Sequence, residues 1–149
     1  MSIENSAGLG VNNVYGPRKT DEGRAGKINT SGVVNELEVS FRGDSYQVVT
    51  AVIPAGSKVL DAYAKVDEVF VLGGTTPTIN VGTSGSAATN GVPVAEASAE
   101  ALGSYDLTPA GTWAAVLAAD TTVAVELGGT TPTITDAGEM KVVVRYVVL

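Results

Sequence analysis

The sequence predicts an all-β fold, a single jelly-roll-like sandwich or barrel that carries an extended N-terminal arm. Three observations lead to this prediction. Eighteen glycines and many Val and Thr residues, with few Lys, Leu or Gln, favour strands and turns over helices. Alternating polar and apolar residues recur from Glu36 onward, which is typical of half-buried strands. The eight residues LGGTTPTI occur twice, at 72–79 and at 127–134.

The first 32 residues differ from the rest of the chain. Glycines punctuate them at short intervals, and their apolar residues follow neither the period of a strand nor that of a helix. Four basic and three acidic residues give this stretch a net charge of +1. Because the whole chain has a net charge of −7, residues 33–149 carry −8. We therefore expect residues 1–32 to form a flexible or partner-ordered arm and residues 33–149 to form the β-sandwich domain.

The first strands follow from the alternation. Residues 36–42 place Leu37, Val39 and Phe41 on one face and polar side chains on the other, so we expect a half-buried strand. Residues 46–53 are apolar on both faces, which predicts a strand inside a sheet.

Residues 58–71 form the longest extended candidate. We expect Leu60 to point inward with the alternate residues that follow it, and a bulge near Asp67 and Glu68, where an acidic residue breaks the apolar row.

The second half of the chain is less regular. Residues 78–81 and 122–127 predict further strands, and residues 140–149 predict a strand covered on both faces. Residues 94–102 are compatible with a helical turn or with irregular β structure. Residues 107–110 and 113–117 are expected to be short extended pieces.

Each copy of LGGTTPTI follows an apolar strand and precedes another extended piece. A Gly-Gly pair followed by Thr-Thr-Pro suits a tight turn, so we interpret the copies as two similar hairpin corners. A sandwich built from two related halves fits this arrangement, because a jelly roll contains two Greek keys.

The composition argues against catalysis and against several partners. The chain has no Cys and no His, which removes thiolate metal sites, the commonest general base and the usual partner of a Ser or Cys nucleophile. No phosphate-binding or dinucleotide-binding motif is present. The net charge of −7 disfavours nucleic acid, and no apolar stretch is long enough to span a membrane. We expect a non-enzymatic protein with no catalytic residues, no cofactor and no metal site.

Two motifs keep other readings open. Trp113, the only tryptophan, could be a platform for sugars, which would make the protein a carbohydrate-binding β-sandwich. The N-terminal arm carries apolar and basic residues that suit a partner better than water. Those we expect to make contact are Val14, Tyr15, Arg18, Lys19, Arg24 and Lys27.

Three segments taken together resemble a known group of proteins. They are IPAGSKVLDAYAKVDEVF at 53–70, INVGTSGSAATNGV at 79–92 and TVAVELGGTTPTITDAGEMKVVVRYVV at 122–148. In this order they resemble small virion proteins of tailed bacteriophages that decorate or cement the capsid. The resemblance covers residues 46–149 and leaves out the arm. It rests on the order of turn motifs such as Ile-Pro-Ala-Gly and Ala-Gly.

The resemblance implies a jelly-roll protomer, usually a homotrimer, bound to the major capsid protein where capsid subunits meet. The protein would then be made in the host cytoplasm and reside on the outer surface of the virion. The group supplies no catalytic residues to carry over. A head-fibre or tail-associated β domain of a phage is the alternative within the same structural class.

Overall fold

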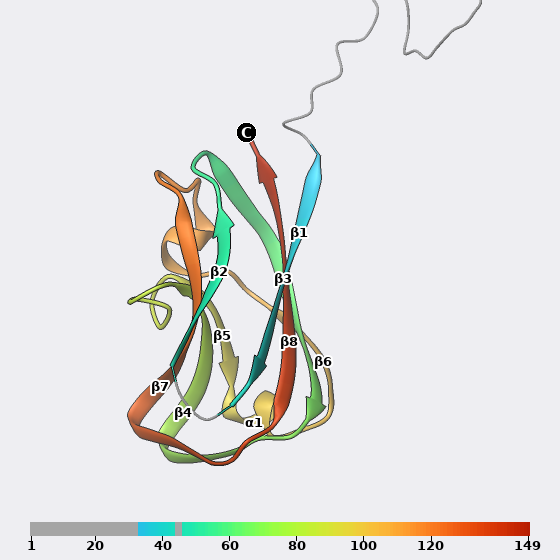
Figure 1. The fold of residues 1–149 in the computed structure, drawn as a ribbon, viewed down its shortest axis with the longest axis vertical. Coiled ribbons are helices and arrows are strands. Elements are labelled where there is room, and N and C mark those ends of the chain that lie inside the picture. Colours follow the sequence, from blue (N-terminus) through green and yellow to red (C-terminus); the bar gives the residue numbers. More distant parts are fainter. Residues whose placement is uncertain (1–32, 44–45) are drawn as a thin grey trace, which may run out of the picture. The chain divides into compact units, whose positions relative to one another are not determined.

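The computed structural model describes residues 33–43 and 46–149. Within them the chain forms eight strands, one turn of α-helix and one short 3-10 helix (Figure 1). In chain order these are β1 (Val34–Arg42), β2 (Gln47–Ile53), β3 (Ser57–Glu68), β4 (Val71–Thr83), β5 (Gly91–Ala95), α1 (Glu96–Ala99), β6 (Gly103–Leu107), η2 (Gly111–Ala114), β7 (Thr121–Asp136) and β8 (Glu139–Val148).

The strands form two antiparallel four-stranded sheets. One has the order β1-β8-β3-β6 and is called here the β1 sheet; the other has the order β2-β7-β4-β5 and is called the β2 sheet. The pairs β1–β8, β2–β7, β3–β6 and β4–β5 show that the chain doubles back on itself as one long antiparallel ribbon. Successive segments of the ribbon alternate between the sheets, and the pairs β3–β8 and β4–β7 complete them. The predicted all-β, jelly-roll-like fold is confirmed.

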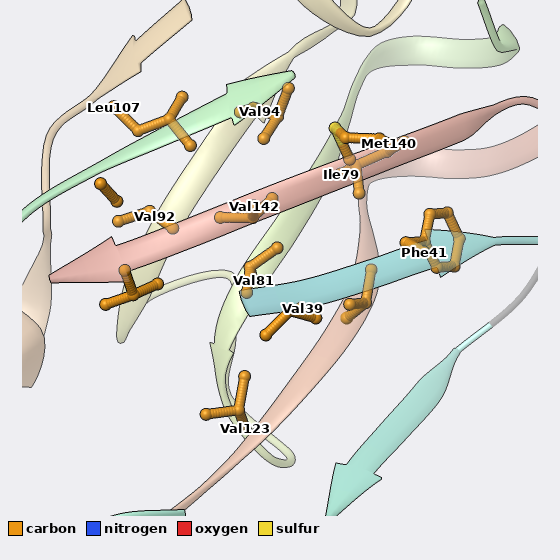
Figure 2. Close-up of a cluster of buried hydrophobic side chains, with 14 of the residues drawn as sticks. Val39, Phe41, Ile79, Val81, Val92, Val94, Leu107, Val123, Met140 and Val142 are labelled. Carbon is orange, nitrogen blue, oxygen red and sulfur yellow. The ribbon is translucent and has the colours of Figure 1, made fainter. Parts of the chain in front are cut away.

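The core lies between the two sheets, and valine is its commonest residue. Figure 2 shows Val39, Phe41 and Val142 of the β1 sheet among side chains of the β2 sheet such as Ile79 and Val123. All five are at most 2% exposed. Side chains alternate across a strand, so each strand contributes every second residue to this layer.

The paired strands β1 and β8 agree with the sequence prediction. In β1, Val39 and Phe41 are buried and Leu37 is half-buried, while the residues between them are exposed. β8 lies between β1 and β3, and its Val143 and Val147 on the outer face are also largely buried, as expected for a covered strand.

Two predictions about the next strands are wrong. β2 is an edge strand, and its Val48 and Val52 are exposed rather than covered by neighbours. Leu60 is also exposed, because the register of β3 against β8 shifts between Val59 and Asp61 and moves Val59 to the inner face in its place. The expected bulge near Asp67 and Glu68 is present as a register shift between Val66 and Glu68.

In the second half of the chain, the structure shows which elements form where the sequence allows more than one. Residues 94–102 contain the end of β5 and the single turn α1, so both readings of that stretch apply in part. The short extended pieces are replaced by β6, which ends at Leu107, and by the 3-10 helix η2, which holds Trp113.

The two LGGTTPTI copies are not hairpin turns, which corrects the sequence interpretation. They lie inside β4 and β7 and pair with each other in antiparallel fashion, Leu72 opposite Ile134 and Ile79 opposite Leu127. Between these pairs the register shifts, and the paired strands pass from the β2 sheet toward the β1 sheet, at the lower end of Figure 1. The copies therefore form one shared corner, related by a local twofold arrangement.

The corner is closed by backbone contacts that only glycine permits. A Cβ atom on Gly74 would lie 2.6 Å from the carbonyl oxygen of Thr131, and one on Gly129 would lie 2.7 Å from that of Thr76. Thr76 and Thr131 themselves adopt positive φ angles of 46° and 47°, which are strained for a β-branched residue. Each threonine hydroxyl donates to the preceding carbonyl at 2.8 Å, which satisfies the hydroxyl locally.

We expect Gly129→Ala to lower the free energy of unfolding by about 2–5 kcal/mol, because the new methyl group meets two carbonyl oxygens at a positive φ. Chemical denaturation measures the change. Gly85→Ala is the matched control: Gly85 also has a positive φ but open space around its Cβ position, so the cost there is about 1–2 kcal/mol. Equal losses in the two variants would contradict the close packing of the corner.

Candidate interaction surfaces

The six arm residues predicted to make contact lie outside the residues that the structure describes. They are Val14, Tyr15, Arg18, Lys19, Arg24 and Lys27. Their role stays a prediction, and the candidate surfaces below belong to residues 33–43 and 46–149.

Charged side chains are concentrated on the strands of the β1 sheet. Every Lys and Arg in the described part lies on β1, β3 or β8: Arg42, Lys58, Lys65, Lys141 and Arg145. They alternate with acidic side chains from the same strands. The outer face of this sheet is therefore a mixed, highly charged surface of the kind that water solvates well.

Ion pairs cross the strands on this face. Arg145 donates to Asp61 at 2.7 Å, and Arg42 donates to Glu139 at 2.5 Å with Glu68 at 3.6 Å. The hydrogen bond to its carboxylate partner, with the attraction between the charges, raises the pKa of each arginine. These side chains are all between 36% and 64% exposed, so solvent screens the pairs, which orient one another but add little to stability.

A shallow hollow lies beside one of these pairs. It is lined by Asp61, Tyr63, Asp106 and Arg145 together with two apolar residues, and has a volume of about 330 Å³. The guanidinium of Arg145 is already bound to Asp61. Among the described residues, no group of three or more His, Cys, Asp or Glu is placed to hold a metal ion. The hollow thus offers a polar depression and no recognisable catalytic arrangement.

The outer face of the β2 sheet is very different. Glu126 and Asp136 are the only charged residues on its four strands in the described part, and Asp136 lies at the far end of β7, beyond the corner. The carboxylate of Glu126 accepts a hydrogen bond from the backbone N–H of Gly85 at 2.9 Å, and the hydroxyl of Tyr46 lies 2.9 Å from that of Ser84. These contacts hold the tip of the β4–β5 hairpin against the sheet, which explains why the outward-pointing Ala124 is fully buried.

Beside the hairpin tip an apolar stripe stays exposed along β2. Tyr46, Val48 and Val52 share the outer side of this segment and are 49%, 51% and 45% exposed. Thr50 lies between them. Contact surfaces between proteins are depleted in charge at their centres, so this stripe suits a protein neighbour better than the charged outer face of the β1 sheet.

Trp113 does not form a sugar platform. Its side chain is fully buried, and its indole N–H donates to the hydroxyl of Thr83 at 3.0 Å. η2 places it between β3 and β5, where it closes one end of the core. The interpretation of the chain as a carbohydrate-binding module centred on Trp113 is therefore wrong, because no face of the ring is available.

Within the described residues, no helix combines the length and the apolar character needed to cross a bilayer. No protein-family model matches the chain, and no curated protein matches it. A solved structure does share the fold. It is a chain of the structure titled "Cyanophage Pam1 capsid asymmetric unit", with a TM-score of 0.57 and 24% sequence identity. The match covers 89% of this chain and 98% of that chain. It shows that the jelly-roll-like fold occurs in a chain of a phage capsid.

Replacing Thr83 by Val should lower the free energy of unfolding by about 1–3 kcal/mol, because the buried indole N–H of Trp113 then loses its acceptor. Thermal or denaturant unfolding measures the loss. The control is Thr122→Val, at an exposed position of β7, where the change should stay within about 0.5 kcal/mol. If both variants behave alike, the indole hydrogen bond does not contribute to stability.

Proposed function

We propose that the protein is a structural virion protein that decorates and stabilises the capsid of a tailed bacteriophage. The observation that carries this proposal is the shared fold with a chain of a cyanophage capsid, which extends over 98% of that chain. Because the shared fold spans 89% of this chain as well, it supports a place for this protein in a phage capsid. The resemblance of residues 46–149 to capsid decoration proteins supports the proposal from the sequence.

The distribution of charge supports it too. A decoration protein needs one surface that faces solvent and another that contacts capsid subunits. The charged outer face of the β1 sheet suits solvent, and the apolar stripe of Tyr46, Val48 and Val52 on the β2 sheet suits a protein contact. Among the described residues Glu126 is the one charged side chain that the register places beside the stripe, so binding there desolvates few ions.

The protein would act by joining capsid subunits. It binds the major capsid protein where subunits meet, on the outer surface of the virion. Several weak contacts made by one oligomer add up, because the second contact forms at a high effective concentration once the first is made. No cofactor and no catalytic step are needed for this role. Resistance of the shell to internal pressure is the expected benefit.

The N-terminal arm supplies part of the contact in this proposal. Its basic residues, Arg18, Lys19, Arg24 and Lys27, oppose the acidic character of residues 33–149 and would meet the shell, with Val14 and Tyr15 as apolar anchors. A stretch of 32 residues is long enough for such contacts, because a fully extended chain spans at most roughly 3.3–3.6 Å per residue.

We expect the purified full-length chain to be a homotrimer, with a mass near three times 15.0 kDa by light scattering coupled to size exclusion. Three copies around one axis match the several subunits that meet at a capsid junction. A stable monomer that also fails to bind phage heads would overturn the proposed function.

Deleting residues 1–30 should abolish most of the affinity for heads, measured by cosedimentation. A finer comparison uses Arg18→Ala with Lys19→Ala, which should weaken binding about tenfold or more at low salt. The matched control is Lys65→Ala with Lys141→Ala, which removes the same charge from the outer face of the β1 sheet and should leave affinity unchanged. Unchanged binding by the deletion variant would show that the arm is not the contact.

A further inference from the structure

Three of the four edge strands in the described part carry features that prevent pairing with another chain. β5 is short and contains Pro93, which lacks a backbone N–H. β6 is equally short and begins at Gly103 with a positive φ. β2 has a shifted register between Val48 and Val52, which bends the strand. Short length, proline and bulges are the usual protections of a sheet edge.

β1 has none of these features. All nine of its residues pair with β8 in one unbroken register, and it contains no Pro and no Gly. No described strand pairs with its other side. A long, regular edge with free backbone groups is a template for another strand. Its charges, Glu36, Glu38 and Arg42, therefore decide which strand it accepts and in which register.

We propose that β1 pairs along this free edge with β1 of a second copy of the chain, antiparallel and centred on Val39. The two sheets would then continue into one another across a twofold axis. In this register Glu36 lies opposite the second copy's Arg42, and Glu38 lies opposite its Ser40. Each opposite-charge pair occurs twice because the contact is symmetric.

The charges exclude two of the neighbouring registers, and a short overlap disfavours the third. If the pair is centred on Glu38, the Glu38 carboxylates of the two copies face each other. If it is centred on Leu37, Glu36 faces the second copy's Glu38, and this repulsive pair occurs twice. Centring it on Ser40 pairs only residues 38–42 of each strand. The register about Val39 is the longest one that keeps the outer faces continuous without opposing like charges.

The inner face of β1 gives a second argument for the same occupant. Leu37 on β1 is only partly buried at the open side of the sandwich, where the edge of β2 places the partly buried Val49. In the proposed register Leu37 lies opposite the second copy's Phe41, whose ring is buried in its own core. The contact thereby covers the part of Leu37 that the isolated domain leaves exposed.

A single strand edge buries less surface than the roughly 1,200 Å² of a stable interface, so this contact is weak between free molecules. On a capsid lattice, where the proposed function holds neighbouring copies side by side, a high effective concentration would populate it. A twofold contact cannot close within one trimer. It would link one trimer to the next.

Cysteine capture tests the register, and the natural chain has no Cys to interfere. Full-length Glu38→Cys and Ser40→Cys variants are oxidised mildly, each alone and mixed in equal amounts, at the same total concentration. A disulfide needs Cα atoms roughly 4.4–6.8 Å apart, which the opposed 38 and 40 positions provide, so we expect about tenfold more linked dimer in the mixture. Non-reducing electrophoresis measures the yield.

The matched control pairs Glu38→Cys with Lys141→Cys. Lys141 lies beside Ser40 on β8, one strand further from the proposed axis, and should give only the background yield. Thermal unfolding of each variant confirms that the domain is intact. Equal linking of all mixtures, self-linking of the single variants at the level of the mixture, or no linking at all would each overturn the proposal. Binding to phage heads plays no part in the readout, so the result is independent of the test of the proposed function.

Discussion

The close crossing of β4 and β7 is the contact on which the rest of the sandwich depends. The two LGGTTPTI copies pass each other there with glycine backbone against threonine carbonyl, at distances that leave no room for a side chain. The crossing bends both strands together, so that one end of the pair belongs to the β2 sheet and the other leads into β3 and β8. Without a shared bend, the doubled ribbon could not alternate between the sheets. The strain held by Thr76 and Thr131 is offset by the packing that this bend permits.

The hydrophobic alternation indicates the correct fold, whereas the repeat does not reveal how its two copies pair. Alternation located β1 and β8 well, because one or both of their faces are buried and the pattern records burial directly. The repeat by itself predicts two separate hairpin corners, whereas its copies pair with each other. Gly-Gly and Thr-Thr-Pro suit a tight turn and a bulged strand equally well, because both need positive φ. Only the partner of the segment distinguishes them, and the partner is far away in the sequence.

Predictions failed elsewhere for similar reasons. Residues 46–53 are apolar on both faces, and the pattern cannot tell a central strand from an edge strand whose outer face is apolar and exposed. Leu60 was placed inward because a bulge at Val59 and Asp61 leaves no mark in the hydrophobic period. The candidate surfaces show the same limit. The segregation of Lys and Arg onto the β1 sheet becomes visible only when the strand order is known, since β1, β3 and β8 are widely separated along the chain.

The pairing of β1 with β8 has a consequence for synthesis. Val34 can pair with Val147 only when almost the whole chain is available. Of the nested strand pairs, β4–β5 alone is a short hairpin, and the others join strands that are far apart in the sequence. Such a high contact order makes folding slow, on the scale of milliseconds to seconds, and favours completion after translation. Until then β8 is missing and β1 has no neighbour on either side. A chain that is still being made, or one cut short before β8, therefore cannot present the finished surfaces of the sandwich.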